Sequence, residues 1–140
     1  MIALLAAAAL AVAPAQAVSE LTPAQLGRAS VYAGMCSTIG WESSRERAMA
    51  LAETYVAETG ADDAVTAAAI DVGVEEATVQ IRGLVEVFGE TGDLESFKTA
   101  VRGLCEQTAR RLPALINATS ETDARFDAAM AALLTDDAAN

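Results

Sequence analysis

The 140-residue sequence contains no histidine, which removes the commonest general base and the commonest metal ligand of proteins. A Ser-His-Asp or Cys-His arrangement is therefore excluded, and two cysteines are too few for an ordinary zinc site. The sequence also lacks a P-loop, a G-x-G-x-x-G turn and a G-x-S-x-G nucleophile motif. These patterns predict no catalytic residue, no cofactor and no metal.

Basic residues are scarce, with nine Lys and Arg against 20 Asp and Glu and a net charge of −11. Nucleic-acid binding needs clustered Lys and Arg, and the pair Arg110-Arg111 belongs at a helix end, where it complements the helix dipole. Anionic membrane surfaces are disfavoured for the same reason. We expect no nucleic-acid partner, and a protein partner chosen by charge would be basic. The alternative is that the acidity only keeps the protein soluble.

The N-terminal segment has the pattern of a cleavable signal peptide. Its first 13 residues carry no charged side chain, and Ala15-Gln16-Ala17 has the small-x-small form of a cleavage site. The absence of Lys and Arg before the apolar run departs from the usual pattern, and an uncleaved apolar helix is the alternative. We expect residues 1–17 to be removed, leaving one domain over residues 18–140. That mature chain has no spanning apolar run and is expected in the periplasm or outside the cell.

The two cysteines, Cys36 and Cys105, are expected to form a disulfide, because exported proteins fold in oxidising compartments. The bond would close a loop of about 70 residues, for which the chain-entropy model gives roughly 4–4.5 kcal/mol. Two free structural cysteines are the alternative. A redox-active pair is disfavoured because the sequence has no C-x-x-C motif.

Helix signals dominate the chain after the signal peptide, whereas strand signals are weak. Thr22, Pro23 and Gln25 predict the capping box that opens a first helix, which ends before Gly40. A second capping box, Ser43 to Glu46, predicts a second helix that closes at Gly60.

A third helix is predicted from Asp62 or Asp63 to Phe88, with a kink or break at Gly73. Its apolar residues fall into two stripes, which predicts a central position in the bundle. The first stripe is Ile70, Val74, Ala77, Ile81, Leu84 and Phe88, and the second is Val65, Val72, Val79 and Val87. The width of this surface is also compatible with self-association into a homodimer.

A fourth helix is capped by Asp93 and ends at Pro113, and a fifth is capped by Ser120. The fifth buries Phe126, Met130 and Leu133. The predicted fold is therefore an all-α bundle of about five helices. In this bundle the disulfide ties the C-terminal half of the first helix to the middle of the fourth.

Two residues are candidates for a site. Trp41, between the first two helices, either anchors a protein partner or plugs the end of the core. Glu95 lies in a segment, Leu94-Glu95-Ser96-Phe97, that resembles in three residues the catalytic Glu-Ser segment of lytic transglycosylases. The Gly- and Gln-containing motif of those enzymes is absent. A solvated residue in the first helical turn is the simpler interpretation of Glu95.

The sequence thus favours an exported interaction protein that acts through its surface and is not an enzyme. In size and predicted architecture it is similar to acid-stress periplasmic chaperones and to immunity proteins that neutralise effectors of rival bacteria. The alternative is a carboxylate-based cell-wall hydrolase or another exported helical enzyme. That alternative requires two carboxyl groups in a cleft, one with a raised pKa.

Overall fold

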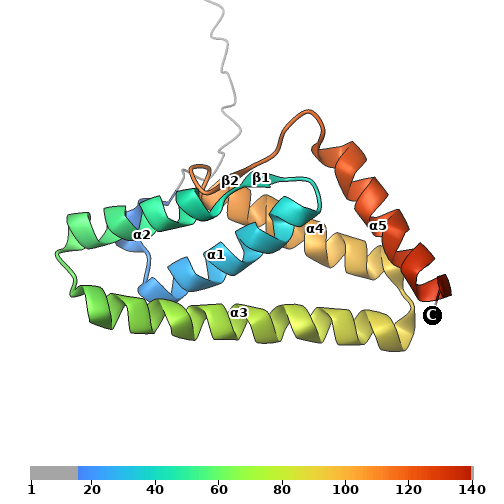
Figure 1. Ribbon diagram of the computed structural model, residues 1–140, viewed down its shortest axis with the longest axis horizontal. Helices are drawn as coiled ribbons and strands as arrows, with labels where there is room; N and C mark the ends of the chain where they lie inside the picture. The colour runs from blue at the N-terminus through green and yellow to red at the C-terminus, as the bar shows by residue number, and fades with distance from the viewer. Residues whose placement is uncertain (1–15, 140) are drawn as a thin grey trace, which may run out of the picture.

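The computed structural model describes residues 16–139, with side chains through residue 135. Five α-helices make up most of this part, which confirms the all-α prediction (Figure 1). The elements in order are a short 3-10 helix η1 (Val18–Glu20), α1 (Pro23–Thr38), β1 (Glu42–Ser43), α2 (Arg45–Thr59), α3 (Asp63–Thr91), α4 (Leu94–Arg111), β2 (Ile116–Asn117) and α5 (Thr122–Ala139). None of these helices has the length and apolar character needed to cross a membrane. Most of the predicted signal peptide lies outside the described residues, so it stays a prediction.

Three helix starts have the predicted caps. The Thr22 hydroxyl accepts from the Gln25 N–H at 3.2 Å, and the Gln25 side chain accepts from the Thr22 N–H at 2.8 Å, which completes the capping box of α1. Asp62 and Asp93 cap α3 and α4 through side-chain bonds of 2.9 and 3.0 Å. Each cap satisfies backbone N–H groups that have no partner within the helix.

Two predicted caps are wrong. Ser44, and not Ser43, caps α2 by accepting from the Arg47 N–H at 3.2 Å. Ser43 belongs to β1, and its hydroxyl donates to the Leu115 carbonyl at 2.7 Å. Helix α5 begins at Thr122, and Ser120 lies in the turn before it, so Ser120 is not the residue next to the helix start. Local spacing assigns both serines to helix caps. In the structure Ser43 instead pairs with a segment distant in sequence, and Ser120 lies in a turn.

Two very short strands link the loop between α1 and α2 to the loop between α4 and α5. Strands β1 and β2 pair antiparallel, with Glu42 opposite Asn117 and Ser43 opposite Ile116. The Arg47 guanidinium reinforces the pair, donating to the Asn117 side chain at 2.7 Å and to the Glu42 carboxylate at 3.1 Å. Two residues per strand are too few to leave an alternating pattern in the sequence, so this ladder was not predicted.

Helices α1 and α3 run in the same general direction, cross at an angle, and make the closest helix–helix approach among the described residues near the start of α1 (Figure 1). Gly27 of α1 lies against the backbone of Ile70 and Val74, and Gly73 of α3 lies against the backbone of Ala24. A Cβ at either glycine would overlap a carbonyl oxygen of the facing helix. The predicted kink or break at Gly73 is therefore wrong, since α3 is continuous from Asp63 to Thr91. The glycine allows backbones to approach and does not interrupt the helix.

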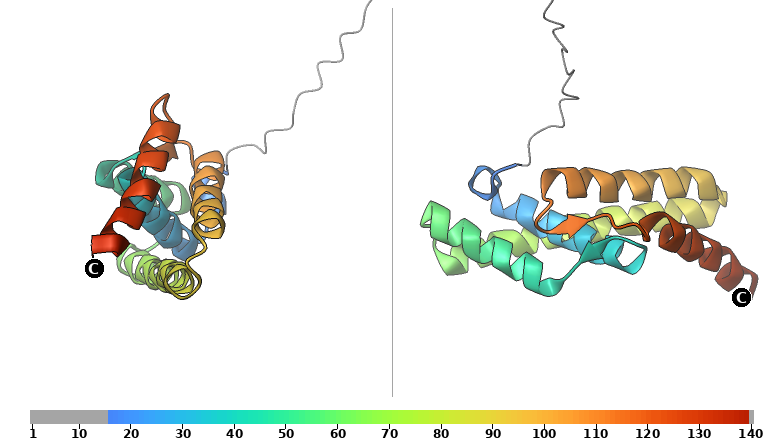
Figure 2. Two further views of the ribbon diagram at one scale, coloured as in Figure 1. Left: turned by 90° about the vertical axis from the view of Figure 1, so that its right-hand side faces the viewer. Right: turned by 90° about the horizontal axis from the view of Figure 1, so that it is seen from above.

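Cys36 of α1 and Cys105 of α4 form the predicted disulfide at the centre of the core, with their Cα atoms 5.7 Å apart. Both residues are fully buried. The bond ties α4 to α1 on the side away from α2, and Figure 2 shows α4 lying alongside the α1–α3 pair. Around the disulfide the core contains Leu26, Ala33, Trp41, Leu51, Val101, Leu112, Leu115, Ile116, Phe126 and Met130.

Helix α3 lies along one edge of the molecule and not at its centre (Figures 1 and 2). Its first predicted stripe faces the bundle, with Ala77 fully buried and the other members partly buried. Its second stripe faces outward, and no other described element covers it. The prediction of a central helix is therefore wrong, and an uncovered apolar face takes its place.

Candidate interaction surface

Two carboxylates of the described part, Glu53 and Asp63, line one shallow groove, and both are solvent-exposed. Every Asp and Glu among residues 16–135 is solvent-exposed, and the buried polar side chains of that part are three threonines: Thr66, Thr108 and Thr122. The Glu95 side chain is 84% exposed and lies 3.6 Å from Lys98 on the next turn. Within the described residues, no group of three or more His, Cys, Asp or Glu is arranged to hold a metal ion.

Trp41 lies inside the core, next to the disulfide. Its side chain is 3% exposed and meets the Phe126 ring edge to face, with ring centroids 5.7 Å apart. Its backbone N–H donates to the Cys36 carbonyl at 3.1 Å, which fixes the turn after α1. This position agrees with the alternative that Trp41 plugs the end of the core, and little of its indole ring is exposed for a partner to contact.

Phe126 also anchors α5 to the rest of the bundle. The Arg102 guanidinium lies over the face of the Phe126 ring, 4.6 Å from its centre. It also donates a hydrogen bond to the Asp123 carboxylate at 3.0 Å. A cation over an aromatic face adds an electrostatic attraction to the packing. Arg102 of α4 therefore holds the N-terminal half of α5.

The outward face of α3 carries four valines, which we call the valine stripe: Val65, Val72, Val79 and Val87. Their exposed fractions are 69%, 54%, 58% and 57%. At 3.6 residues per turn, the four fall within an arc of about 80° of the helix circumference. Isolated exposed apolar residues are ordinary, but a row of them along one helix is typical of an interaction surface.

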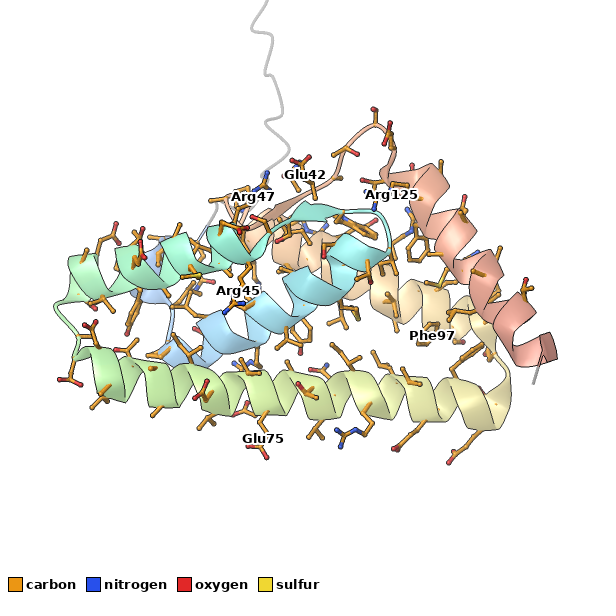
Figure 3. The ribbon with its side chains drawn as sticks, in the orientation of Figure 1. Glu42, Arg45, Arg47, Glu75, Phe97 and Arg125 are labelled. Carbon is orange, nitrogen blue, oxygen red and sulfur yellow. A yellow bond between two sulfur atoms is a disulfide. The ribbon has the colours of Figure 1, made fainter. Side chains whose placement is uncertain are left out.

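Charged residues flank the valine stripe, and most of them are acidic. Asp71, Glu75 and Glu86 are exposed on the same side of α3, and the only basic residue there is Arg82. Figure 3 shows Glu75 directed away from the other helices. Asp71, Glu75 and Glu86 make no ion pair with any described residue, whereas Glu76, which lies within the arc of the valine stripe, pairs with Arg28 of α1 at 2.6 Å.

A second apolar surface is a shallow groove between α2 and the first half of α3. Its larger part encloses about 370 Å³ and adjoins a part of about 190 Å³, because the two share Ala52 and Ile70. Small side chains leave this space, chiefly Ala48, Ala52, Ala57 and Ala67. The groove was not predicted from the sequence. Its signal is the row of alanines on α2, but which helix faces them depends on contacts distant in sequence.

Asp93, the N-cap residue of α4, is an acidic group whose pKa depends on the hydrogen bonds at the start of that helix. Hydrogen bonds from the Ser96 hydroxyl and backbone N–H hold the pKa of Asp93 below its ordinary value. A carboxyl with a depressed folded-state pKa stabilises the fold above its unfolded pKa, and loses that contribution as the pH falls through the folded pKa. Burial raises the pKa of Tyr32, whose hydroxyl donates to Gln80.

We therefore expect the thermal midpoint to stay level between pH 8 and about pH 6, and to fall below about pH 5. There is no histidine to titrate near neutrality, and the described carboxylates are exposed. Asp93→Asn keeps a hydrogen-bond acceptor at the cap but cannot titrate, so its midpoint should fall less between pH 7 and pH 3. Calorimetry of both proteins across this range measures the difference. Unfolding of the wild type near pH 6 would contradict the assignment to carboxylates.

Comparisons of the chain with models of known families, with curated proteins and with solved structures found no match. What the protein does must therefore be inferred from its own residues. The candidate binding surfaces are the valine stripe with its acidic flanks and the groove between α2 and α3.

Proposed function

We propose that the chain is an exported helical protein that binds a protein partner through its outer surface. The observation that carries this proposal is the valine stripe, a row of more than half-exposed apolar side chains on the longest helix. A neighbouring side of the same helix is held against α1 at the two glycine contacts. The stripe is therefore presented on a rigid element, as binding surfaces of small proteins require.

Export is supported by the chemistry of the core. A disulfide at its centre joins Cys36 to Cys105, and such bonds persist mainly in oxidising compartments. The apolar N-terminal segment with its small-x-small site also supports export. Together they favour the periplasm or the extracellular space as the place where the partner is met.

Binding in the folded state, as in immunity-type proteins, fits the structure better than release of the fold by acid. The ion pairs between helices, Arg28–Glu76 and Arg102–Asp123, join partly exposed groups. Exposed ion pairs contribute only about 0–1 kcal/mol, so protonating their carboxylates opens no seam by itself. The hydrolase alternative is disfavoured because the two carboxylates that line one described groove, Glu53 and Asp63, are both solvent-exposed.

The test places a photoreactive amino acid on the surface of the full-length chain expressed in a Gram-negative bacterium. We expect the protein in the periplasmic fraction, with the mass of a chain that begins at Val18 and two fewer hydrogens than the reduced form. Irradiation with the probe at position 72 should give a discrete adduct with another protein. Glu106 on α4 provides a matched exposed position, at which a weaker adduct or none is expected.

A cytoplasmic protein that retains residues 1–17 with reduced cysteines would refute export. The absence of a protein adduct at position 72, at position 106 and in the groove at Met49 would refute the interaction role.

A further inference from the structure

We infer that the valine stripe binds a partner helix whose apolar seam is flanked by Lys and Arg. This inference rests on the proposed function, because it names the surface and the chemistry of the partner. The partner meant here is a basic amphipathic segment of another protein.

The spacing of the valines suits a helical partner. Val65, Val72 and Val79 lie seven residues apart, and Ala68 lies exposed between the first two. Residues seven apart occupy one of the two seam positions of a heptad, along which helices pack at a small angle, and the other seam position beside these valines holds Ala69, Glu76 and Gly83. Helix α3 is continuous over 29 residues, or about 43 Å at 1.5 Å per residue, so the valines lie along one uninterrupted helix.

The charges beside the valine stripe select a basic partner. Asp71, Glu75 and Glu86 flank the valines, against the single Arg82, and the whole chain has a net charge of −11. In helix pairs the residues beside the apolar seam decide which partner is accepted. Lys and Arg at those positions of the partner would meet carboxylates. Glu and Asp there would meet like charge.

A second copy of this chain is disfavoured as the occupant. It would bring the same carboxylates against Asp71, Glu75 and Glu86, with one arginine per copy to offset them. The four half-exposed valines also offer only a few hundred Å², whereas a stable interface buries about 800 Å² per partner. The area fits a reversible complex that charge attraction assists.

The binding test uses three fluorescent 28-residue peptides and anisotropy titration of the full mature protein. The first peptide has Leu at the two seam positions of each heptad and Lys at the two flanking positions. The second has Glu in place of Lys, and the third has the composition of the first in scrambled order. We expect micromolar binding of the Leu/Lys peptide, weakening as salt is added, and at least ~10-fold weaker binding of the other two.

The deciding variant is Val72→Ser with Val79→Ser, which removes apolar contact from the middle of the valine stripe without changing the charge. It should weaken binding of the Leu/Lys peptide at least ~10-fold. The matched control is Val85→Ser with Leu134→Ser, since these side chains are 52% and 51% exposed but lie away from the stripe. The control should bind as the wild type does, and thermal midpoints should show that both variants are folded.

Three results would overturn the inference. The first is equal weakening by the matched control, because the peptide would then be held by net charge alone. The second is equal binding of the Glu peptide. The third is a homodimer in sedimentation that Val72→Ser with Val79→Ser dissociates, because a second copy would then cover the stripe. If crosslinks form at Met49 or position 106 while the peptide does not bind, this inference fails and the proposed function stands.

Discussion

Reduction of the Cys36–Cys105 bond is expected to lower the free energy of unfolding by about 4 kcal/mol, a large part of the ~5–15 kcal/mol typical of small domains. The bond joins residues 69 apart in sequence, so the unfolded chain gains much freedom when it is broken. Urea titrations of the oxidised and reduced wild type, followed by circular dichroism, measure the difference directly. Both states keep the same side chains, so packing changes little between them.

The double variant Cys36→Ala with Cys105→Ala is the control for effects of the reductant. Both sulfurs are fully buried, so this variant should be at least as unstable as the reduced wild type. A loss below about 1 kcal/mol on reduction would show that the unfolded chain is already compact without the bond. The central role of the disulfide would then be withdrawn.

Gly73→Ala is expected to destabilise the protein by about 3 kcal/mol or more, at or above the upper end for overpacked sites. The added methyl group would overlap the Ala24 carbonyl, and a backbone atom cannot rotate away as a side chain can. Either α1 and α3 separate or one of them bends. Both changes loosen the packing around the disulfide and lower the midpoint of thermal and urea unfolding.

The matched control lies ten residues further along the same helix. Nothing lies within 4 Å of a Cβ at Gly83, so Gly83→Ala should raise stability by up to about 1 kcal/mol through helix propensity. The same contrast is expected in α1, where Gly27 contacts α3 and Gly34 contacts nothing. If Gly73→Ala behaves as Gly83→Ala does, the close approach of α1 and α3 is incorrect.

Local signals in the sequence were enough to predict the helices and most of their ends. The capping residues Thr22, Asp62 and Asp93, and the stops at Gly40 and Gly60, act on backbone groups within a few residues. The disulfide was also predictable, because the chain has only one pair of cysteines and both lie on apolar helix faces.

Features that depend on distant contacts were not predictable in this way. Gly73 has the local signature of a helix interruption, and only the position of Ala24 shows that it is a point of close approach. Ser43 has the local signature of a cap, but its pairing with Ile116 is 73 residues away. The valine stripe was visible as a pattern, yet whether the bundle covers it depends on where α3 lies in the bundle.

The position of the disulfide along the chain also determines how the molecule withstands proteolysis. Helices α2 and α3 and the exposed turn between them, residues 60–62, lie inside the segment that the bond closes. A protease that cuts once within that turn leaves two fragments that remain covalently joined, with the valine stripe still attached to α4. The connection before α5 has no such protection, because a cut at residues 118–121 separates the last helix from the rest. In a compartment rich in proteases, nicked molecules would therefore keep the proposed binding helix and lose α5 first.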